Sequence, residues 1–170
     1  YTSGTTGRPK GAELTHFNLF FNCDYVANKL LASDDPKVSL TVLPLFHSFG
    51  QTCMQNATIR GGGTIVLIPR FDAAQVFGAI QAHKVNLFAG VPTMYFGLLH
   101  NPESDAYDVS SLEFCLSGGA AMPVEVMNAF DKKYGVSILE GYGLSETSPV
   151  ASFNVLERPK KPGSVGIPIE

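Results

Sequence analysis

The sequence lacks two features that would have placed it in a broad class at once. No uninterrupted apolar run approaches the roughly 20 residues that a membrane-spanning helix needs. Basic residues are not in excess, because 12 Lys and Arg stand against 15 Asp and Glu, for a net charge of −3. This balance provides no general basic field that would attract nucleic acid or an anionic membrane surface.

Cysteine is also scarce. The three cysteines, Cys23, Cys53 and Cys115, are far apart and odd in number. Such usage fits reduced, buried thiols better than a disulfide framework. We therefore predict a cytoplasmic protein and leave contact with the periphery of a membrane open.

Several well-known motifs are absent. Counted from Gly4, a Walker A loop would need glycine where Pro9 stands, and neither Ser nor Thr follows Lys10. The glycines of 61–63 begin like a dinucleotide fingerprint, but Val66 occupies the place of its last glycine. There is no G-x-S-x-G elbow and no Cys/His cluster with zinc-ligand spacing.

What is present is an alternation of helical and strand-like segments in a chain that is 45% hydrophobic. The periodicity predicts helices over 16–31, 51–60, 73–83, 92–99 and 123–134. Short apolar runs predict strands over 38–43, 64–68, 85–89, 114–116 and 136–139. This order predicts an α/β fold, with a mainly parallel β-sheet and helices on both faces.

Ligands of such sheets bind at the carboxyl ends of the strands. Four segments follow predicted strands and carry glycine, hydroxyl, histidine or acidic residues: 44–50, 90–92, 117–121 and 141–147. We expect a binding site where they meet.

The N-terminal run YTSGTTGRPKG combines four hydroxyl residues with three glycines and Lys10. Glycines let backbone N–H groups turn toward an anion, hydroxyls add donors and the lysine adds charge, which together suit a polyphosphate. A flexible polar linker is the alternative.

A second cluster, EGYGLSET, covers 140–147. Tyr142 can offer an aromatic face to a base, and Glu146 beside Thr147 supplies the hard oxygens that suit Mg²⁺ bound with phosphate. A tight turn followed by an acidic helix start is the alternative.

Together these segments resemble the adenylate-forming (AMP-binding) superfamily, which includes acyl-CoA synthetases, peptide-synthetase adenylation domains and luciferases. TSGTTGRPKG resembles the family's phosphate-loop signature, and GYGLSET resembles its second core signature. LPLFHSFG (43–50) and CLSGGAAMP (115–123) are similar to intervening segments, so the resemblance covers essentially the whole chain in order. The nearest resemblance is to fatty-acyl-CoA synthetases.

The resemblance implies the core of the large domain of such an enzyme, with residues 1–170 forming part of an AMP-binding domain. The upstream part of that domain and the C-terminal lid domain would lie outside this chain, which begins at Tyr1 inside a glycine-rich loop. We therefore expect this segment by itself to be inactive.

The resemblance also implies roles for individual residues. The residues implied to bind the ATP phosphates are Thr2, Ser3, Gly4, Thr5, Thr6, Gly7 and Lys10. The residues implied to surround the adenine are Gly118, Gly119, Ala120, Gly141, Tyr142 and Gly143. Thr147 would contact the α-phosphate, Glu146 would bind Mg²⁺ with Thr2, and His47 matches an active-site histidine. The residues implied to act in catalysis are His47, Lys10, Glu146 and Thr147.

The implied partners are small molecules: ATP, which yields AMP, a carboxylic acid and coenzyme A. The predicted acyl-pocket segments are apolar and contain Phe46, Phe49, Gly90, Val91, Met94, Val165 and Gly166, which favours a medium- or long-chain fatty acid. Two alternatives stay open. One is an amino-acid adenylation domain that loads a carrier protein, and the other is a nucleotide-binding module without turnover.

Overall fold

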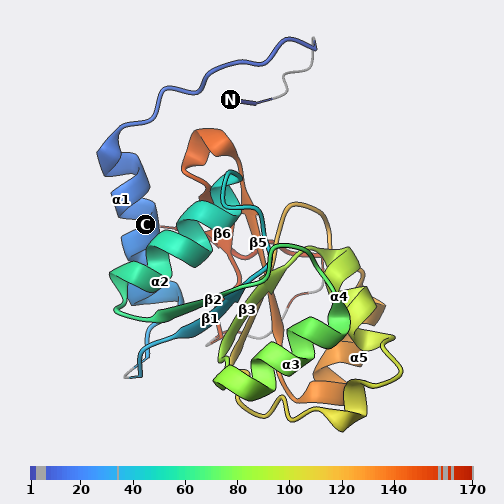
Figure 1. The fold of residues 1–170 in the computed structure, drawn as a ribbon. Helices are drawn as coiled ribbons and strands as arrows, with labels where there is room; N and C mark the ends of the chain where they lie inside the picture. Colours follow the sequence, from blue (N-terminus) through green and yellow to red (C-terminus); the bar gives the residue numbers. More distant parts are fainter. Residues whose placement is uncertain (3–6, 34, 157, 159–160, 162, 170) are drawn as a thin grey trace.

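The computed structural model describes residues 1–2, 7–33, 35–156, 158, 161 and 163–169, and Figure 1 shows them around one central sheet. The sheet has seven strands in the order β2-β1-β3-β4-β5-β6-β7 within this part of the chain. The strands are β1 (Val38–Thr41), β2 (Thr64–Leu67), β3 (Leu87–Gly90), β4 (Phe114–Ser117), β5 (Ile138–Gly143), β6 (Val150–Phe153) and β7 (Ile167–Pro168).

The first five strands are parallel, which confirms the predicted sheet. In their register Gly90 lies beside Ser117, and Ser117 lies beside Glu140. The carboxyl ends of β3, β4 and β5 therefore meet at one edge, as the sequence predicted.

The two remaining strands, β6 and β7, run antiparallel to their neighbours and were not predicted. β6 pairs with the second half of β5, so that the segment 144–149 becomes the loop of a hairpin. The glycines of 141–143, predicted as the loop that follows a strand, belong instead to β5. A strand so rich in glycine has no apolar alternation by which it could be predicted.

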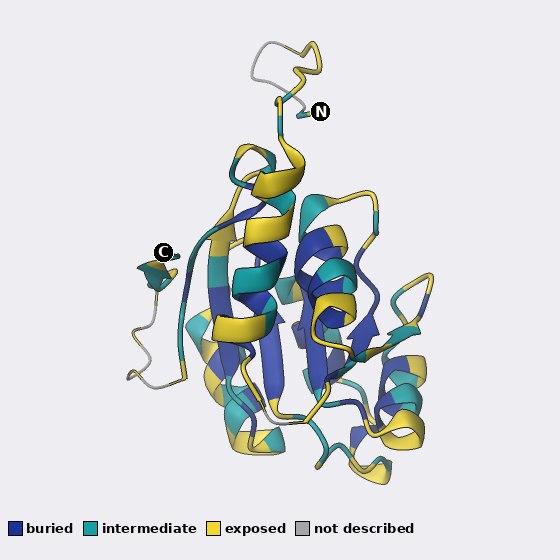
Figure 2. Ribbon diagram, turned by 90° about the vertical axis from the view of Figure 1, so that its left-hand side faces the viewer, coloured by how far each residue is buried: buried dark blue, intermediate teal, exposed yellow. Residues whose placement is uncertain are grey.

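Helices cover both faces of the sheet, as predicted (Figure 1). One face carries α1 (His16–Tyr25), its π-helical continuation Val26–Leu30, the π-helix Phe49–Asn56 and α2 (Ala57–Arg60). The other face carries α3 (Ala73–His83), α4 (Pro92–Leu99) and α5 (Val124–Tyr134). Short 3₁₀ turns occur at Ser104–Ala106 and Ser145–Thr147. Figure 2 shows that the central strands β1, β3 and β4 are largely buried and that the outer faces of the helices are exposed.

Local signals account for the start of the first helix. The hydroxyl of Thr15 accepts a hydrogen bond from the backbone N–H of Asn18 at 3.1 Å, as an N-cap does. The predicted helix 16–31 changes to π-helical geometry at Val26. The predicted helix 51–60 is also π-helical in part, and it begins two residues earlier than predicted, at Phe49.

Among the described residues, no helix combines the length and apolarity needed to cross a membrane.

Candidate functional site

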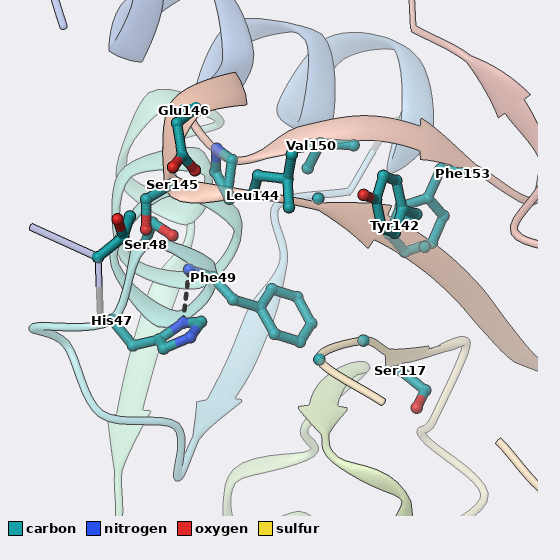
Figure 3. A pocket seen from close by; sticks show the side chains of 16 residues that line it. His47, Ser48, Phe49, Ser117, Tyr142, Leu144, Ser145, Glu146, Val150 and Phe153 are labelled. Atoms are coloured by element: carbon teal, nitrogen blue, oxygen red, sulfur yellow. Dashed lines mark hydrogen bonds between the residues drawn. The ribbon is translucent and has the colours of Figure 1, made fainter. Parts of the chain in front are cut away.

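A cavity of about 520 Å³ opens at the carboxyl edge of the sheet, and Figure 3 shows its lining. Its lining residues come from four separate parts of the chain: Thr2; His47, Ser48 and Phe49; Ser117, Gly118 and Gly119; and Gly141, Tyr142, Gly143, Leu144, Ser145, Glu146, Pro149, Val150 and Phe153. Three of the four predicted post-strand segments contribute to this lining. The segment 90–92 does not.

The first wall is the glycine segment that follows β4. A Cβ atom built on Gly118 would lie 3.3 Å from the ring of Phe49 and 3.6 Å from the backbone oxygen of Gly141. The two glycine segments are thus neighbours across the cavity. A side chain at position 118 would fill the space between them.

The second wall is the β5–β6 hairpin. Gly141 has no room for a side chain, because a Cβ atom there would overlap the ring of Phe153 on the facing strand. Gly143 is equally confined, because its Cβ atom would overlap the backbone oxygen of Pro149. Tyr142, between them, keeps 49% of its surface exposed and lines the cavity. The two glycines therefore let the hairpin close while the aromatic ring stays available to a ligand.

The hairpin loop carries the acidic group of the cavity. Glu146 is exposed, and no other described residue forms an ion pair or hydrogen bond with its carboxylate. Thr147 does not line the cavity. Its hydroxyl accepts from the N–H of Leu144 at 3.0 Å and is within donating distance of the backbone oxygens of Leu144 and Pro149. The Thr147 side chain thus stabilises the turn that presents Glu146.

His47 lies across the cavity from Glu146, in the turn before the π-helix Phe49–Asn56 (Figure 3). Its Nδ1 atom accepts a hydrogen bond from the backbone N–H of Phe49 at 3.2 Å. The neutral ring therefore carries its proton on Nε2, which has no hydrogen-bond partner among the described residues and can donate to a ligand. Phe49 itself points into the cavity (Figure 3).

The N-terminal segment reaches the cavity through Thr2. Two backbone hydrogen bonds join Thr2 to Lys10: Thr2 N–H donates at 2.8 Å and Lys10 N–H donates at 2.9 Å. Lys10 and Gly7 are exposed and do not line the cavity, and neither does Ala120. The predicted phosphate-binding residues Ser3, Gly4, Thr5 and Thr6 lie outside the described residues.

The predicted acyl-pocket residues are dispersed. Phe49 lines the cavity, whereas Phe46 is 94% exposed and Met94 packs against the hydrophobic cores of both faces of the sheet. The cavity instead has apolar residues that the sequence did not single out, among them Leu144, Val150 and Phe153.

Sequence reasoning assigned no individual role to two buried polar side chains beside the cavity, although Ser117 belongs to the predicted segment 117–121. The Ser117 hydroxyl is fully buried and has no hydrogen-bond partner among the described residues. Asn22, on α1, is 2% exposed and bonds to the hairpin loop. The available signal for Asn22 was a polar residue directly before Cys23 in the predicted helix 16–31.

The order of these segments along the chain and their meeting at one cavity agree with a known family. The family model described as AMP-binding enzyme matches residues 1–170. The chain belongs to this family. The resemblance of the four sequence segments is thereby confirmed.

Several relatives within the AMP-binding family are CoA ligases. The chain is 46% identical over 169 residues to a long-chain-fatty-acid–CoA ligase of Bacillus subtilis (strain 168), covering 99% of this chain and 30% of the relative. A crystal structure of an anthranilate CoA ligase in complex with anthranoyl-AMP superimposes with a TM-score of 0.90 at 28% identity, covering 100% of this chain and 33% of that one.

A third relative is the O-succinylbenzoate coenzyme A synthetase from Bacillus subtilis, in complex with ATP and magnesium ion. It has a TM-score of 0.85 and 31% identity, and the match covers 99% of this chain and 34% of that one. The chain thus spans about a third of the length of these relatives.

Proposed function

We propose that the protein containing this chain is an acid–CoA ligase that activates a medium- or long-chain fatty acid with ATP. The observation that carries the proposal is the cavity, because both family signatures contribute to it: Thr2 from the phosphate loop, and Gly141–Glu146 from the second signature. The 46% identity to a fatty-acid–CoA ligase supports the choice of substrate.

The reaction has two steps. A carboxylate oxygen of the acid attacks the α-phosphorus of ATP, and the bond to pyrophosphate breaks to leave an acyl-adenylate. The sulfur of coenzyme A then attacks the acyl carbonyl carbon, AMP leaves, and the thiol proton passes to solvent. The main physical obstacle in the first step is repulsion between a carboxylate and a triphosphate, so the site must neutralise charge.

The glycine walls and Tyr142 bind the nucleotide in this proposal. The adenine enters between the backbone of Gly118–Gly119 and the ring of Tyr142, with Gly141 and Gly143 permitting close approach. A half-exposed aromatic ring at a cavity wall supplies the apolar face that a purine needs. A side chain at Gly118 would obstruct this slot.

Mg²⁺ fits the oxygen ligands available. Mg²⁺ takes one or two protein ligands, and phosphate oxygens and water complete its shell. Glu146 offers a carboxylate without an ion-pair partner among the described residues, and the hydroxyl residue Thr2 lines the same cavity. These two residues would hold the ion, which when bound supplies charge neutralisation and polarises the phosphate oxygens.

Two cationic or donor side chains complete the site. The backbone pairing of Thr2 with Lys10 carries the lysine along with the phosphate loop, where its charge neutralises the triphosphate. His47 donates from Nε2 to an oxygen of the carboxylate or the α-phosphate, because its Nδ1 is occupied by the Phe49 N–H. Thr147 acts on the α-phosphate mainly by holding the loop, since its hydroxyl is engaged with the backbone.

The apolar lining favours a fatty acid over an amino acid. Phe49, Leu144, Val150 and Phe153 line the cavity, and the described lining includes no Asp that could pair with an α-amino group. We also propose a cytoplasmic location, on the ground that its cysteines are free and buried.

Acid-dependent pyrophosphate–ATP exchange by the full-length protein tests the proposal. We expect exchange with laurate or palmitate, and acyl-CoA formation when coenzyme A is added. Exchange with ferulate or benzoate but not with fatty acids would refute the fatty-acid assignment and keep the ligase. Exchange with amino acids alone would refute both.

A further inference from the structure

Asn22 is a buried amide in an apolar environment. It lies on α1, the helix that follows the phosphate loop, and its neighbours Cys23 and Val26 belong to the hydrophobic core on this face of the sheet. Only 2% of its surface is exposed. Burying an amide is costly unless its hydrogen bonds are made, so its partners define its role.

Among the residues that the structure describes, every hydrogen-bond partner of the Asn22 side chain is on the β5–β6 hairpin, more than 120 residues along the chain. The Asn22 Nδ2 donates to the backbone oxygens of Thr147 at 3.2 Å and Val150 at 3.0 Å. Its Oδ1 accepts from the N–H of Val150 at 3.2 Å. Both protons of the amide and its oxygen are therefore used on this hairpin.

These bonds hold the segment that directly follows Glu146. The loop's internal bonds, Thr147 N–H to Leu144 O at 3.1 Å and Leu144 N–H to Pro149 O at 3.0 Å, determine its shape. They do not determine its position relative to α1. Among the described residues, Asn22 forms every hydrogen bond between α1 and residues 144–150.

We infer that Asn22 is a positioning residue for the adenylation step. It holds the hairpin at Thr147 in the loop and at Val150 at the start of β6, so that the Glu146 carboxylate stays directed at the cavity. It also connects the two signature segments, because α1 continues from the phosphate loop and the hairpin carries the acidic group. The inference rests on the proposed function, in which Glu146 acts on the metal–nucleotide complex.

The chemistry requires an amide at this position. Alanine would leave the Val150 N–H and two carbonyl oxygens without their partner. Aspartate would keep an acceptor for the Val150 N–H, but its charge would face the carbonyl oxygens of Thr147 and Val150. The inference therefore predicts that Asn22→Asp, despite its nearly identical shape, is at least as harmful as Asn22→Ala.

The test uses the full-length protein and fatty-acid-dependent pyrophosphate exchange. We expect Asn22→Ala and Asn22→Asp to lower kcat about 10- to 100-fold, as a displaced active-site group does. The Mg²⁺ concentration for half-maximal rate should rise, and the KM for the fatty acid should change less than about threefold, because the acyl contacts are untouched. Asn28→Ala is the matched control. The Asn28 side chain is exposed, lies on the π-helical continuation of α1 and donates to Asp24 Oδ1 at 2.8 Å. Its removal should leave kcat, the Mg²⁺ dependence and the fatty-acid KM unchanged.

A double-mutant cycle distinguishes positioning from general damage. If Asn22 acts through Glu146, Asn22→Ala should add little to the loss already caused by Glu146→Gln. Two outcomes would overturn the inference while leaving the proposed function intact. In one, the double variant loses kcat by the product of the two single losses. In the other, Asn22→Ala changes only the KM for the fatty acid. A wild-type protein without acid-dependent exchange would overturn both.

Thermal unfolding of every variant shows whether the cycle is measured on folded protein. If Asn22→Ala does not fold, Asn22→Ser replaces it in the same cycle. Serine keeps one hydrogen-bond donor at this position. The loss of activity caused by Asn22→Ser should likewise nearly vanish when it is measured in the Glu146→Gln background.

Discussion

The Oε1 atom of Glu140 accepts a hydrogen bond from the backbone N–H of Met122 at 2.8 Å. Both residues are buried, and the bond joins the segment that follows β4 to the middle of β5. Gly118 and Gly119 precede Met122, and Gly141 follows Glu140. This one contact therefore helps hold the two glycine walls of the cavity at a constant separation.

Replacing Glu140 tests that contact. Glu140→Ala leaves the buried Met122 N–H without its acceptor, and we expect the free energy of unfolding to fall by about 1–3 kcal/mol. Glu140→Gln keeps a carbonyl oxygen and should lose less. Denaturant unfolding of the two variants measures the difference. Equal losses would mean that the hydrogen bond is not what matters at this position.

Gly141→Ala tests the closure of the hairpin. The new methyl group would overlap the Phe153 ring, so β5 and β6 must separate, and we expect lower stability together with weaker ATP binding. Gly78→Ala is the control, since a Cβ atom at this position in α3 meets nothing within 4 Å. It should raise stability slightly, because alanine is favoured over glycine within helices. Wild-type stability and nucleotide affinity in Gly141→Ala would contradict the packing described.

Tyr142 tests the proposed adenine slot. Tyr142→Ala removes the aromatic face and should weaken ATP binding about tenfold, which corresponds to about 1.4 kcal/mol. Tyr142→Phe keeps the ring and should bind nearly normally. Isothermal titration with ATP and Mg²⁺ compares the two. Loss in both variants would point to the hydroxyl and away from stacking.

Lys10 and Glu146 test the charge neutralisation. In the full-length protein, Lys10→Ala and Glu146→Ala should each slow adenylation at least about tenfold, as loss of one contact to developing charge does. Pyrophosphate exchange at saturating fatty acid provides the measurement. Lys161→Ala removes a lysine that does not line this cavity and should have no effect. Unchanged rates in both site variants would refute the assignment of these residues.

The buried thiol of Cys53 predicts a pH dependence of stability. Burial raises the pKa of Cys53 from its usual 9.0 to about 12. Below about pH 8 the thiol is protonated in both the folded and the unfolded state, and its contribution to stability is complete. As pH rises toward 12, the thiol of the unfolded chain ionises while the native one does not, so the free energy of unfolding falls by up to about 1.4 kcal/mol per pH unit.

Cys53→Ala isolates this contribution. The difference in unfolding free energy between wild type and Cys53→Ala should be constant from about pH 7 to 8 and shrink by about 1–2 kcal/mol on going to about pH 10.5. Urea titrations at each pH provide the measurement. A difference that does not change with pH would show that the Cys53 thiol is accessible to solvent in the native protein.

Much of the fold was predictable because its signals are local. Thr15 caps α1 and Pro92 begins α4, and both act on residues next to them in the sequence. The apolar runs that predicted the parallel strands are equally local, and the structure confirms those strands. Parallel order follows from the alternation of helix and strand. The strands β6 and β7 escaped prediction because β6 is short and pairs with a glycine-rich partner, whose pairing is a tertiary event.

The candidate site divides in the same way. The sequence itself shows the residue types expected of a phosphate loop in 2–11, of a glycine wall in 117–121 and of an acidic turn in 141–147. The sequence does not show which of these residues face one cavity. The segment 90–92 and Lys10 do not line the cavity, whereas Leu144, Val150 and Phe153 do.

The amino-acid order alone therefore indicated the five helical segments, the five parallel strands and the chemistry carried by each loop. Only the tertiary structure decided that the hairpin closes against Phe153, that Glu140 joins two walls, and that Asn22 holds a loop more than 120 residues away. The physical reason is the distance along the chain over which each interaction acts. Caps and periodicity act within a few residues, whereas a buried polar group finds its partner only after packing has removed water from around it.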